Sequence, residues 1–309
     1  MKKIIIAVLA LYIAGMLVWW RSIPGKPVTI VLPEGASSRQ IAHILKSRNV
    51  ISSPAAFLAV AAVSGRLSRL KSGVYSLSPR SSVVTVLMAV SEGKKRLGRV
   101  TIPEGFTAAQ IADLLAEKKV VDRERFLSLA RERHLEGFLF PQTYFFEPGI
   151  RETNVVERMQ HEFRHVFTPA MTERAATMGM SEREIVIMAS IIEKEAVKPE
   201  ERSLIAGVFY NRLRRGQYLG SCATVQYVLR HRKARLSLDD VKVVSPYNTY
   251  RHRGLPPGPI CNPGKDSIVA ALYPAETEDL YFVADGTGTH FFSRSFKQHL
   301  RNKQKANKK

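Results

Sequence analysis

The alternation of apolar and polar positions repeats once along the N-terminal half of the chain. A β-branched run at 28–31 leads into a Pro-Glu-Gly turn, and the stretch 33–45 that begins with this turn recurs in related form at 103–115. In both copies apolar residues then fall three and four positions apart, which is the spacing of one helix face. Ser37 and Thr107 precede these positions, where a helix N-cap belongs. Each copy therefore predicts a strand, a turn and a capped helix.

The residues after each capped helix extend the prediction to a small α+β module. A second short helix and a returning strand fit the remaining length, and residues 72–77 suit the returning strand of the first copy. The pattern resembles LysM-type wall-binding modules, which bind glycans that contain N-acetylglucosamine. A structural repeat that binds nothing fits the sequence equally well, because fold alone does not fix function.

From residue 151 onward the pattern is mainly helical. Apolar spacing predicts helices at 154–167, 171–180, 204–215 and 266–272, and a strand at 280–284. A further helix begins at Ser181, where Glu184 three residues later completes a capping box. Gly216 is placed to end the helix at 204–215. The predicted fold class is thus α+β, and the polar, basic tail 301–309 is expected to be disordered.

An uncharged apolar run occupies residues 4–20, directly after Met1-Lys2-Lys3. Its length is at the short end for a membrane-spanning helix and exceeds the usual core of a signal peptide. Trp19 and Trp20 fall where an interfacial aromatic belt belongs. We expect a single-pass signal anchor in the inner (plasma) membrane, with residues 1–3 cytoplasmic and the remainder extracytoplasmic, or periplasmic. A cleaved signal peptide is the alternative.

The charge balance indicates anionic partners. The chain has 47 Lys and Arg against 27 Asp and Glu, a net charge of +20. Nucleic acid, anionic lipid and anionic wall polymer all fit such a balance. No nucleic-acid module is recognisable and the chain is expected to be exported, so nucleic acid is not an expected partner. The two cysteines, Cys222 and Cys261, are too few for a disulfide scaffold, and the sequence leaves open whether they pair.

The helix that begins at Ser181 carries the candidate catalytic group. Its apolar stripe consists of Ile185, Met188, Ala189, Ile192 and Ala196. Glu193 lies at one edge of this stripe and Glu195 at the other. A carboxyl group among apolar neighbours is a candidate general acid, because desolvation favours its neutral form. Spacing does not choose between the two, and two ordinary boundary glutamates fit the pattern as well.

A competing motif occurs at 161–165, where His161, Glu162 and His165 match the HExxH pattern of zinc peptidases. The apolar face of that predicted helix is set by Val155, Met159, Phe163 and Val166, and both histidines lie off it. No third-ligand motif follows, although a zinc site requires one. We therefore expect a solvated helix face here, and neither a metal nor a cofactor.

Several motifs occur in a fixed order along the chain. They are LEGFLFPQTY (135–144), ASIIEKE (189–195), VFYNRL (208–213), TVQY (224–227), YNTY (247–250), GLPPGPI (254–260) and LYFVADG (280–286). This ordered set closely resembles the endolytic murein transglycosylases of the YceG-like (MltG) family, over nearly the whole chain. The resemblance implies an inner-membrane enzyme that cuts peptidoglycan glycan strands internally, near the membrane and on nascent strands. The family's catalytic glutamate, the first of Ser-Ile-x-Glu-Lys-Glu, falls on Glu193.

The resemblance further implies that one carboxyl group acts first as acid and then as base. The product would carry a 1,6-anhydro end on N-acetylmuramic acid (MurNAc), formed without uptake of water. Our candidates for substrate contact are Tyr247, Asn248, Thr249 and Tyr250, with Asn211 and Gln226 nearby. Glycan strands are the expected partner, and peptidoglycan synthases are candidate partners. A non-catalytic peptidoglycan-binding scaffold is the alternative function.

One departure from the family pattern is visible. Many relatives carry Thr-Asp-Pro-Thr or Ser-Asp-Pro-Thr where this chain has Ser-Cys-Ala-Thr at 221–224, so no role of that aspartate carries over. The expected organisation is an anchor at 4–20, a LysM-like module at 21–97, a catalytic domain at 98–300 and a basic tail at 301–309. Residues 98–150 of the catalytic domain contain the second LysM-like repeat.

Overall fold

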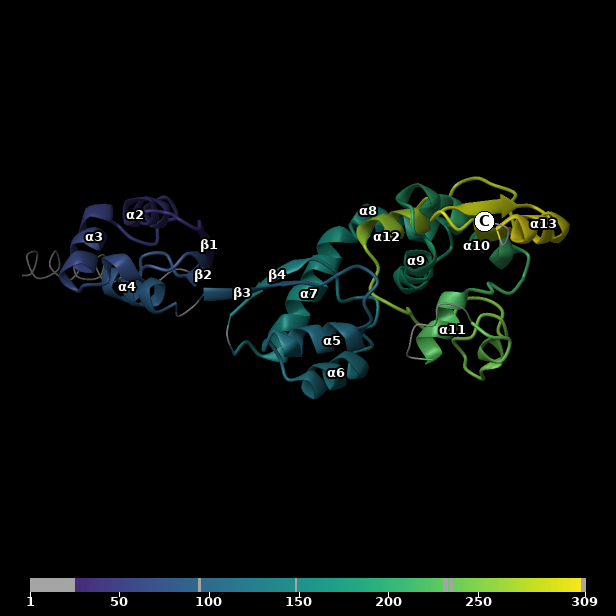
Figure 1. The fold of residues 1–309 in the computed structure, drawn as a ribbon, viewed down its shortest axis with the longest axis horizontal. Coiled ribbons are helices and arrows are strands. Elements are labelled where there is room, and N and C mark those ends of the chain that lie inside the picture. The colour runs from purple at the N-terminus through teal and green to yellow at the C-terminus, as the bar shows by residue number, and fades with distance from the viewer. Residues whose placement is uncertain (1–25, 94–95, 148, 230–232, 234–235, 307–309) are drawn as a thin grey trace, which may run out of the picture. The chain divides into compact units, whose positions relative to one another are not determined.

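The computed structural model describes residues 26–93, 96–147, 149–229, 233 and 236–306 (Figure 1). The chain forms two compact units: residues 1–100 with 145–150, and residues 101–144 with 151–309. Both contain helices and antiparallel strands, which confirms the α+β class. The predicted anchor at 4–20 lies outside the described residues. Within the part of the chain that the structure describes, no helix combines the length and apolar character needed to cross a bilayer.

The first unit contains the first copy of the repeat. Its elements are β1 (Val28–Leu32), α2 (Ser38–Ser47), α3 (Pro54–Val63), the short 3-10 helix η1 (Leu67–Arg69), β2 (Gly73–Leu77) and α4 (Val83–Glu92). Strands β1 and β2 pair antiparallel, from Val28 opposite Leu77 to Leu32 opposite Gly73. Alternate residues of each strand are buried, as a sheet with one covered face requires. The predicted order of strand, helix, helix and strand is confirmed.

The second copy has the same order of elements. Strand β3 (Arg96–Thr101) is followed by α5 (Ala108–Glu117), α6 (Arg123–Glu132) and β4 (Thr143–Phe146), and the sheet order is β1-β2-β3-β4. Both predicted N-caps are confirmed, because Ser37 and Thr107 each accept a hydrogen bond from the backbone of a glutamine three residues on. The glutamine side chain bonds back in each case, which makes both caps capping boxes.

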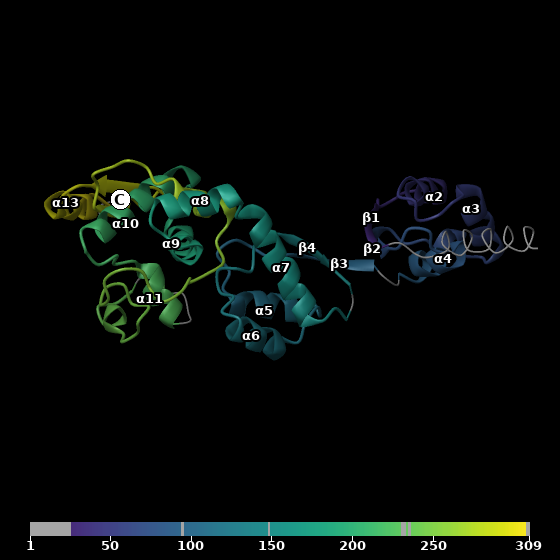
Figure 2. The same ribbon diagram turned by 180° about the vertical axis from the view of Figure 1, so that it is seen from behind.

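Helix α9 (Glu182–Glu195) is the centre of the second unit. Helices α8 (Pro169–Thr177), α10 (Arg202–Arg214), α11 (Cys222–Leu229) and α12 (Lys265–Leu272) all contact it, and α7 (Glu152–Val166) contacts α6 (Figure 2). Every residue from Ile185 to Ile192 is buried, a wider apolar surface than the predicted stripe. The capping box of Ser181 and Glu184 is confirmed at the start of α9. Neighbours on several sides explain why the helix is apolar nearly all round.

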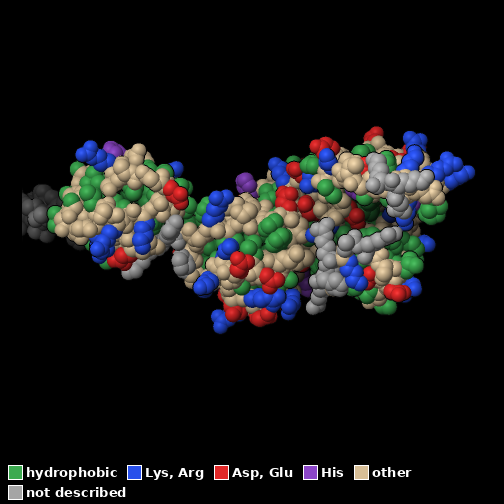
Figure 3. All heavy atoms as spheres, in the orientation of Figure 1, with side chains coloured by type: hydrophobic (Ala, Val, Ile, Leu, Met, Phe, Trp, Pro, Cys, Tyr) green, Lys and Arg blue, Asp and Glu red, His purple; other side chains and the backbone are tan. Residues whose placement is uncertain are grey.

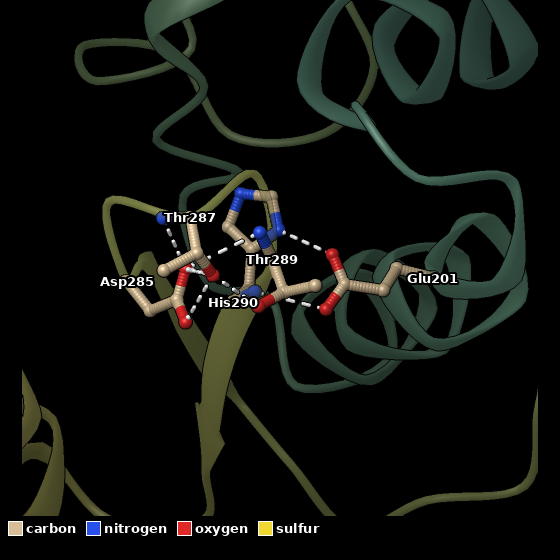
Figure 4. A network of polar contacts seen from close by, with 5 residues as sticks. All are labelled: Glu201, Asp285, Thr287, Thr289 and His290. Carbon is tan, nitrogen blue, oxygen red and sulfur yellow. Dashed lines mark hydrogen bonds and ion pairs between the residues drawn. The ribbon is translucent and has the colours of Figure 1, made fainter.

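The C-terminal part is a hairpin followed by a helix. Strands β5 (Tyr281–Ala284) and β6 (His290–Ser293) pair antiparallel, and the turn between them is held by Asp285, which accepts hydrogen bonds from the Thr287 and Thr289 amides. Figure 4 shows how His290 joins the hairpin to Glu201, the residue before α10, through its backbone N–H at 2.8 Å and its ring Nδ1 at 2.7 Å.

The prediction of a disordered tail is wrong for residues 301–306. They belong to α13 (Phe296–Ala306), which packs on the β5–β6 hairpin. Aromatic contacts give the physical reason, since the Tyr281 ring lies 5.3 Å from the His299 ring and 5.8 Å from that of Phe296. The outer face of α13 carries exposed cationic side chains, which Figure 3 shows gathered at this end. Residues 307–309 are not described.

A buried amide fastens the second repeat to the segment that precedes α12. Asn262 is fully buried, and its backbone accepts from the Gly105 amide and donates to the Phe106 carbonyl, each at 2.9 Å. Its side chain donates to the same carbonyl and to Glu136, and accepts from Leu139 N at 2.8 Å. Each of these hydrogen bonds links Asn262 to a residue more than 100 positions away in the sequence. The Pro-Glu-Gly turn of the second repeat is therefore held in one place.

Glu136 is the acidic member of this cluster. Its carboxyl accepts from the Ala108 amide at 3.0 Å, at the start of α5, and from the Asn262 side chain at 3.0 Å. Burial raises the pKa of Glu136 to about 7, against the lowering effect of these hydrogen bonds. The folded protein thus keeps a proton that the unfolded chain releases near its ordinary pKa of 4.5.

The first prediction concerns Glu136→Gln. The contribution of Glu136 to stability is full below pH 4.5 and is lost as pH rises through about 7, because the unfolded state ionises first. Between pH 5 and pH 8 we expect the free energy of unfolding of the wild type to fall by roughly 2–3 kcal/mol more than that of the variant. Urea denaturation of both proteins at the two pH values measures this difference. Parallel pH dependence in the two proteins would contradict it.

The second prediction concerns Gly207 in α10. A Cβ added there would lie 2.6 Å from the Ala275 carbonyl oxygen and 2.8 Å from a Thr277 methyl group. Since a backbone oxygen has little room to move, Gly207→Ala should destabilise the second unit by about 1–3 kcal/mol. Gly98→Ala is the control, because its Cβ meets only an ordinary contact at 3.8 Å. Thermal unfolding followed by circular dichroism should show a lower Tm for the first variant alone.

Candidate functional site

Glu193 is the first partly exposed residue after the buried run of α9. Its Oε2 atom accepts hydrogen bonds from the Ser267 hydroxyl at 2.7 Å and from the Gly264 amide at 3.1 Å. Gly264 is the N-cap of α12, so the carboxyl lies where a helix dipole favours negative charge. No hydrogen bond to its Oε1 atom is formed by any described residue. Glu193 is therefore fixed through one oxygen, and the other is available for proton transfer.

A second carboxyl group, that of Glu104, lies beside Glu193. It comes from the Pro-Glu-Gly turn of the second repeat. A Cβ built on Gly264 would lie 2.0 Å from Glu104 Oε1, so the Glu104 carboxyl covers the backbone of Gly264. A Cβ on Gly105 would lie 3.5 Å from Glu193 Cγ. The pKa of Glu104 is raised, first by burial and next by the charge of Glu193.

Two cationic side chains, Lys194 and Arg202, position the residues around Glu104 and Glu193. Lys194 donates from Nζ to the Gly105 carbonyl at 3.1 Å, which fastens α9 to the turn that carries Glu104. Arg202, on α10, donates from Nε to the Ser267 hydroxyl at 3.2 Å and lies 3.9 Å from Asp266. Ser267 thus receives a hydrogen bond from Arg202 while it donates one to Glu193. These contacts fix the hydroxyl in the orientation that binds the carboxyl.

Glu195 lies at the other edge of α9 and binds the start of a different helix. Its Oε1 atom accepts from the Ser221 hydroxyl and, at 3.4 Å, from the Ala223 amide, at the beginning of α11. Ser221 in turn donates its backbone N–H to the Thr249 hydroxyl at 3.0 Å. Glu195 therefore ties α9 to α11 and to the loop of residues 245–250. Both motif glutamates bind helix N-termini, so contacts alone do not separate their roles.

Asn248 and Thr249, predicted to contact substrate, have buried side chains that bind their own chain. Asn248 is 0% exposed and donates to the carbonyls of Val241 and Val243 at 2.9 and 2.8 Å. Thr249 is 1% exposed and shares a hydrogen bond of 2.9 Å with Thr224. These contacts hold the loop in shape. The side chains of Asn248 and Thr249 thus satisfy groups of their own chain, and contact of this loop with substrate stays a prediction.

The two tyrosines of the loop differ in exposure. Tyr247 is half-buried, with its ring 5.1 Å from that of Tyr227. Tyr250 is 38% exposed and its hydroxyl lies 3.1 Å from the Cys222 sulfur. Burial and the neighbouring Cys222 raise the pKa of Tyr250, so its hydroxyl stays protonated. The structure groups Tyr250 with Cys222 near Glu195, and no hydrogen bond among the described residues joins this loop to Glu193.

The last two predicted contacts, Asn211 and Gln226, also bind their own chain. Asn211 donates to the carbonyls of Thr277 and Asp279 at 2.8 and 2.9 Å, ahead of β5. Gln226 donates to the Lys233 carbonyl and accepts from its amide, both at 2.9 Å. Each amide side chain holds one loop onto one helix.

The cysteines form separate contacts. Cys222 begins α11, and its sulfur lies near the Tyr250 hydroxyl. Cys261 is fully buried and donates to the Ser190 carbonyl at 3.3 Å. Both are free thiols in this structure. Burial raises the pKa of each thiol, so both are held in the neutral form.

The HExxH motif lies on α7 as predicted. His161 and His165 are exposed, and His161 Nδ1 is 3.6 Å from the adjacent Glu162. Among the described residues, no group of three or more His, Cys, Asp or Glu side chains is arranged to hold a metal ion.

Glu104 is the site residue that sequence reasoning missed. Its signal was present, since the repeat itself marked the Pro-Glu-Gly turn. Both copies were interpreted as the same kind of module, so a separate role for the turn of the second copy was not considered.

Comparison with known proteins is consistent with this geometry. The YceG-like family matches residues 30–305. A Bacillus subtilis (strain 168) protein named endolytic murein transglycosylase is 33% identical over 305 residues, which cover 90% of this chain and 84% of the relative. A protein of the same name from Streptococcus pneumoniae serotype 2 (strain D39) is 29% identical, and the alignment covers 90% of this chain but 58% of the relative.

A crystal structure of a YceG-like protein from Listeria monocytogenes superposes with a TM-score of 0.63 at 31% identity. The match covers 89% of this chain and 98% of that one. The family match includes α9 and the second repeat, and the similarity in fold covers most of the chain. The chain belongs to the YceG-like family.

Proposed function

We propose that this protein is a lytic transglycosylase that cleaves glycan strands of peptidoglycan internally, at the bond between MurNAc and N-acetylglucosamine. The observation that carries the proposal is the position of Glu193. A carboxyl at the end of a buried helix has one oxygen fixed by Ser267 and Gly264, and the other has no partner among the described residues. Membership of a family with relatives named endolytic murein transglycosylase supplies the substrate class.

In the proposed reaction Glu193 donates its proton to the bridging oxygen as the bond from that oxygen to C1 of MurNAc breaks. The C6 hydroxyl of the same MurNAc then attacks C1, and the carboxylate takes the hydroxyl proton. The products are a free hydroxyl on N-acetylglucosamine and a 1,6-anhydro end on MurNAc. Glu193 is protonated again at the end, and no water is consumed. A carboxyl fixed through one oxygen suits both transfers, because its acting oxygen keeps its position.

We assign this activity to nascent strands at the extracytoplasmic face of the inner membrane. Support comes from the apolar run at 4–20, whose length and flanking residues suit a single-pass anchor. A peptidoglycan synthase, which supplies strands at that surface, is the matching partner. The LysM-like first unit is assigned to glycan binding on its order of elements, and an anchored enzyme with a binding unit meets its polymer at high local concentration.

The third prediction tests the assignment of the acid. Glu193→Gln keeps the acceptor oxygen for Ser267 and Gly264 but has no acidic proton, so cleavage should fall about a thousandfold with little change in Tm. Glu195→Gln is the matched control two residues away, and it should retain activity within about tenfold because the family motif places the acid at Glu193 and the amide keeps an acceptor oxygen for Ser221 and Ala223. Mass spectrometry of digested glycan strands measures both. Inactivity of Glu195→Gln with an active Glu193→Gln would reverse the assignment.

The nature of the product tests the function itself. Anhydro ends from the wild type support a transglycosylase, whereas reducing ends would make it a hydrolase. Binding of glycan by the wild type without any cleavage would favour the scaffold alternative.

The fourth prediction concerns the N-terminus. Protein purified from membranes should begin at Met1 or Lys2, and a chain that starts at Ser22 should be soluble and still cleave glycan. Intact-mass measurement reads the first residue directly. A mature start shortly after Trp20 would show that the apolar run is a removed signal peptide.

A further inference from the structure

The two copies of the repeat form the same turn in different surroundings. Gly35 and Gly105 have nearly equal φ angles, +75° and +73°. A Cβ on Gly35 would meet nothing within 4 Å, whereas one on Gly105 would contact Glu193 and Lys194 at 3.5 Å. The preceding glutamates are Glu34 in the first copy and Glu104 in the second. Only the second turn delivers its glutamate to the site on α9.

We propose that Glu104 is a second catalytic carboxyl group of this site, which faces the sugar as a carboxylate while Glu193 acts as acid and base. The proposal rests on the proposed function, and it adds a residue to which that mechanism gives no role. Three observations carry it: the fixed position of the turn, the distance between the two carboxyls, and the lack of a hydrogen bond to Glu104 from any described residue.

The position of the turn is fixed from two sides. The Gly105 amide donates to the Asn262 carbonyl at 2.9 Å, and Lys194 donates to the Gly105 carbonyl at 3.1 Å. One bond comes from the segment before α12 and the other from the catalytic helix. Glu104 precedes Gly105 in the chain, so its backbone is held by both elements. A catalytic group needs such rigid support.

The distance between the carboxyls follows from Gly264. Its amide is 3.1 Å from Glu193 Oε2, and the place of its missing Cβ is 2.0 Å from Glu104 Oε1. With ordinary backbone dimensions, the two oxygens are at most about 8 Å apart. Carboxyl pairs that flank a scissile glycosidic bond lie about 5–9.5 Å apart, and this upper limit is compatible with such a pair. The absence of a side chain at Gly264 is what allows the approach.

The chemistry assigns different tasks to the two groups. Breaking the bond to C1 leaves positive charge on the ring carbon and ring oxygen, and a nearby carboxylate stabilises that charge. Glu193 donates and then accepts the proton in the proposed reaction. Glu104 is exposed and no described residue donates a hydrogen bond to it, so its carboxylate is suited to the electrostatic task.

This division predicts a particular pH dependence. The charged groups that face Glu104 are Glu193 on α9, Arg202 on α10 and Asp266 on α12, while Lys194 is bound to its turn. Burial and the two acidic neighbours raise the pKa of Glu104, and Arg202 opposes them. The rate of the wild type should therefore fall on the acid side as Glu104 takes up a proton. A glutamine at 104 has no proton to take up, so that fall should disappear.

The test compares Glu104→Gln with Glu34→Gln, the same substitution in the same turn of the first copy. With purified full-length protein and glycan strands, Glu104→Gln should lower kcat on the order of a hundredfold, with KM changed less than about threefold. It should also lose the acid-side fall of the rate. Glu104→Asp, which restores the charge, should recover part of kcat. Glu34 lies in the unit assigned to glycan binding, so only kcat is compared for Glu34→Gln, and this kcat should stay within about twofold of the wild type at every pH.

A further variant covers the case in which Glu104→Gln fails to fold. Gly264→Ala keeps the amide that binds Glu193 and has an ordinary φ of −74°, but its Cβ displaces the Glu104 carboxyl. It should show the same loss of kcat. The proposal is overturned if wild type forms anhydro ends, Glu193→Gln is inactive, and Glu104→Gln matches the wild type in kcat and pH profile. Failure of the proposed function gives a different result, in which the wild type itself forms no anhydro ends.

Discussion

The hydrogen bonds of Asn262 are the constraint on which the site depends. A fully buried amide that binds Phe106, Glu136 and Leu139 joins the second repeat to the segment before α12. Loss of one partner would leave a buried polar group without a bond, which costs more than the bond itself contributes. The same cluster contains the Glu136 carboxyl, whose pKa burial raises to about 7. The turn beside the site is thus held by hydrogen bonds within the second unit.

Helix α9 is a buried core element, and the residues at its C-terminal end form the candidate site. Its eight buried residues fix the axis, and the two glutamates after them bind the starts of α12 and α11 respectively. Each carboxyl lies at a helix N-terminus, where the backbone amides favour its charge. Three helices are therefore positioned by one short motif. Glu193 then differs from Glu195 by its neighbour, the turn of the second repeat.

Local patterns predicted local structure well, and they failed where contacts came from distant parts of the chain. The caps at Ser37, Thr107 and Ser181 follow from one residue and its neighbour three positions on, so sequence sufficed. The sequence did not show that Asn248 binds the carbonyls of Val241 and Val243, because it does not reveal which backbone groups need partners, and contact of this loop with substrate stays a prediction. The helix at 296–306 was missed because its stabilisation comes from Tyr281, on a strand. Glu104 was missed because a repeat suggests equal roles for both copies.

The path of the chain between the two units has a mechanical consequence. The polypeptide leaves the first unit after Val100, returns at Phe145, and leaves again after Ile150. Of the returning residues, Phe145 and Phe146 belong to β4, which pairs with β3 at the end of the four-stranded sheet. A fragment cut after Val100 would lose this strand and expose the edge of β3, which invites pairing with other chains. Neither unit is one continuous piece of sequence, so tension on the first unit reaches the second through three chain crossings rather than one flexible linker.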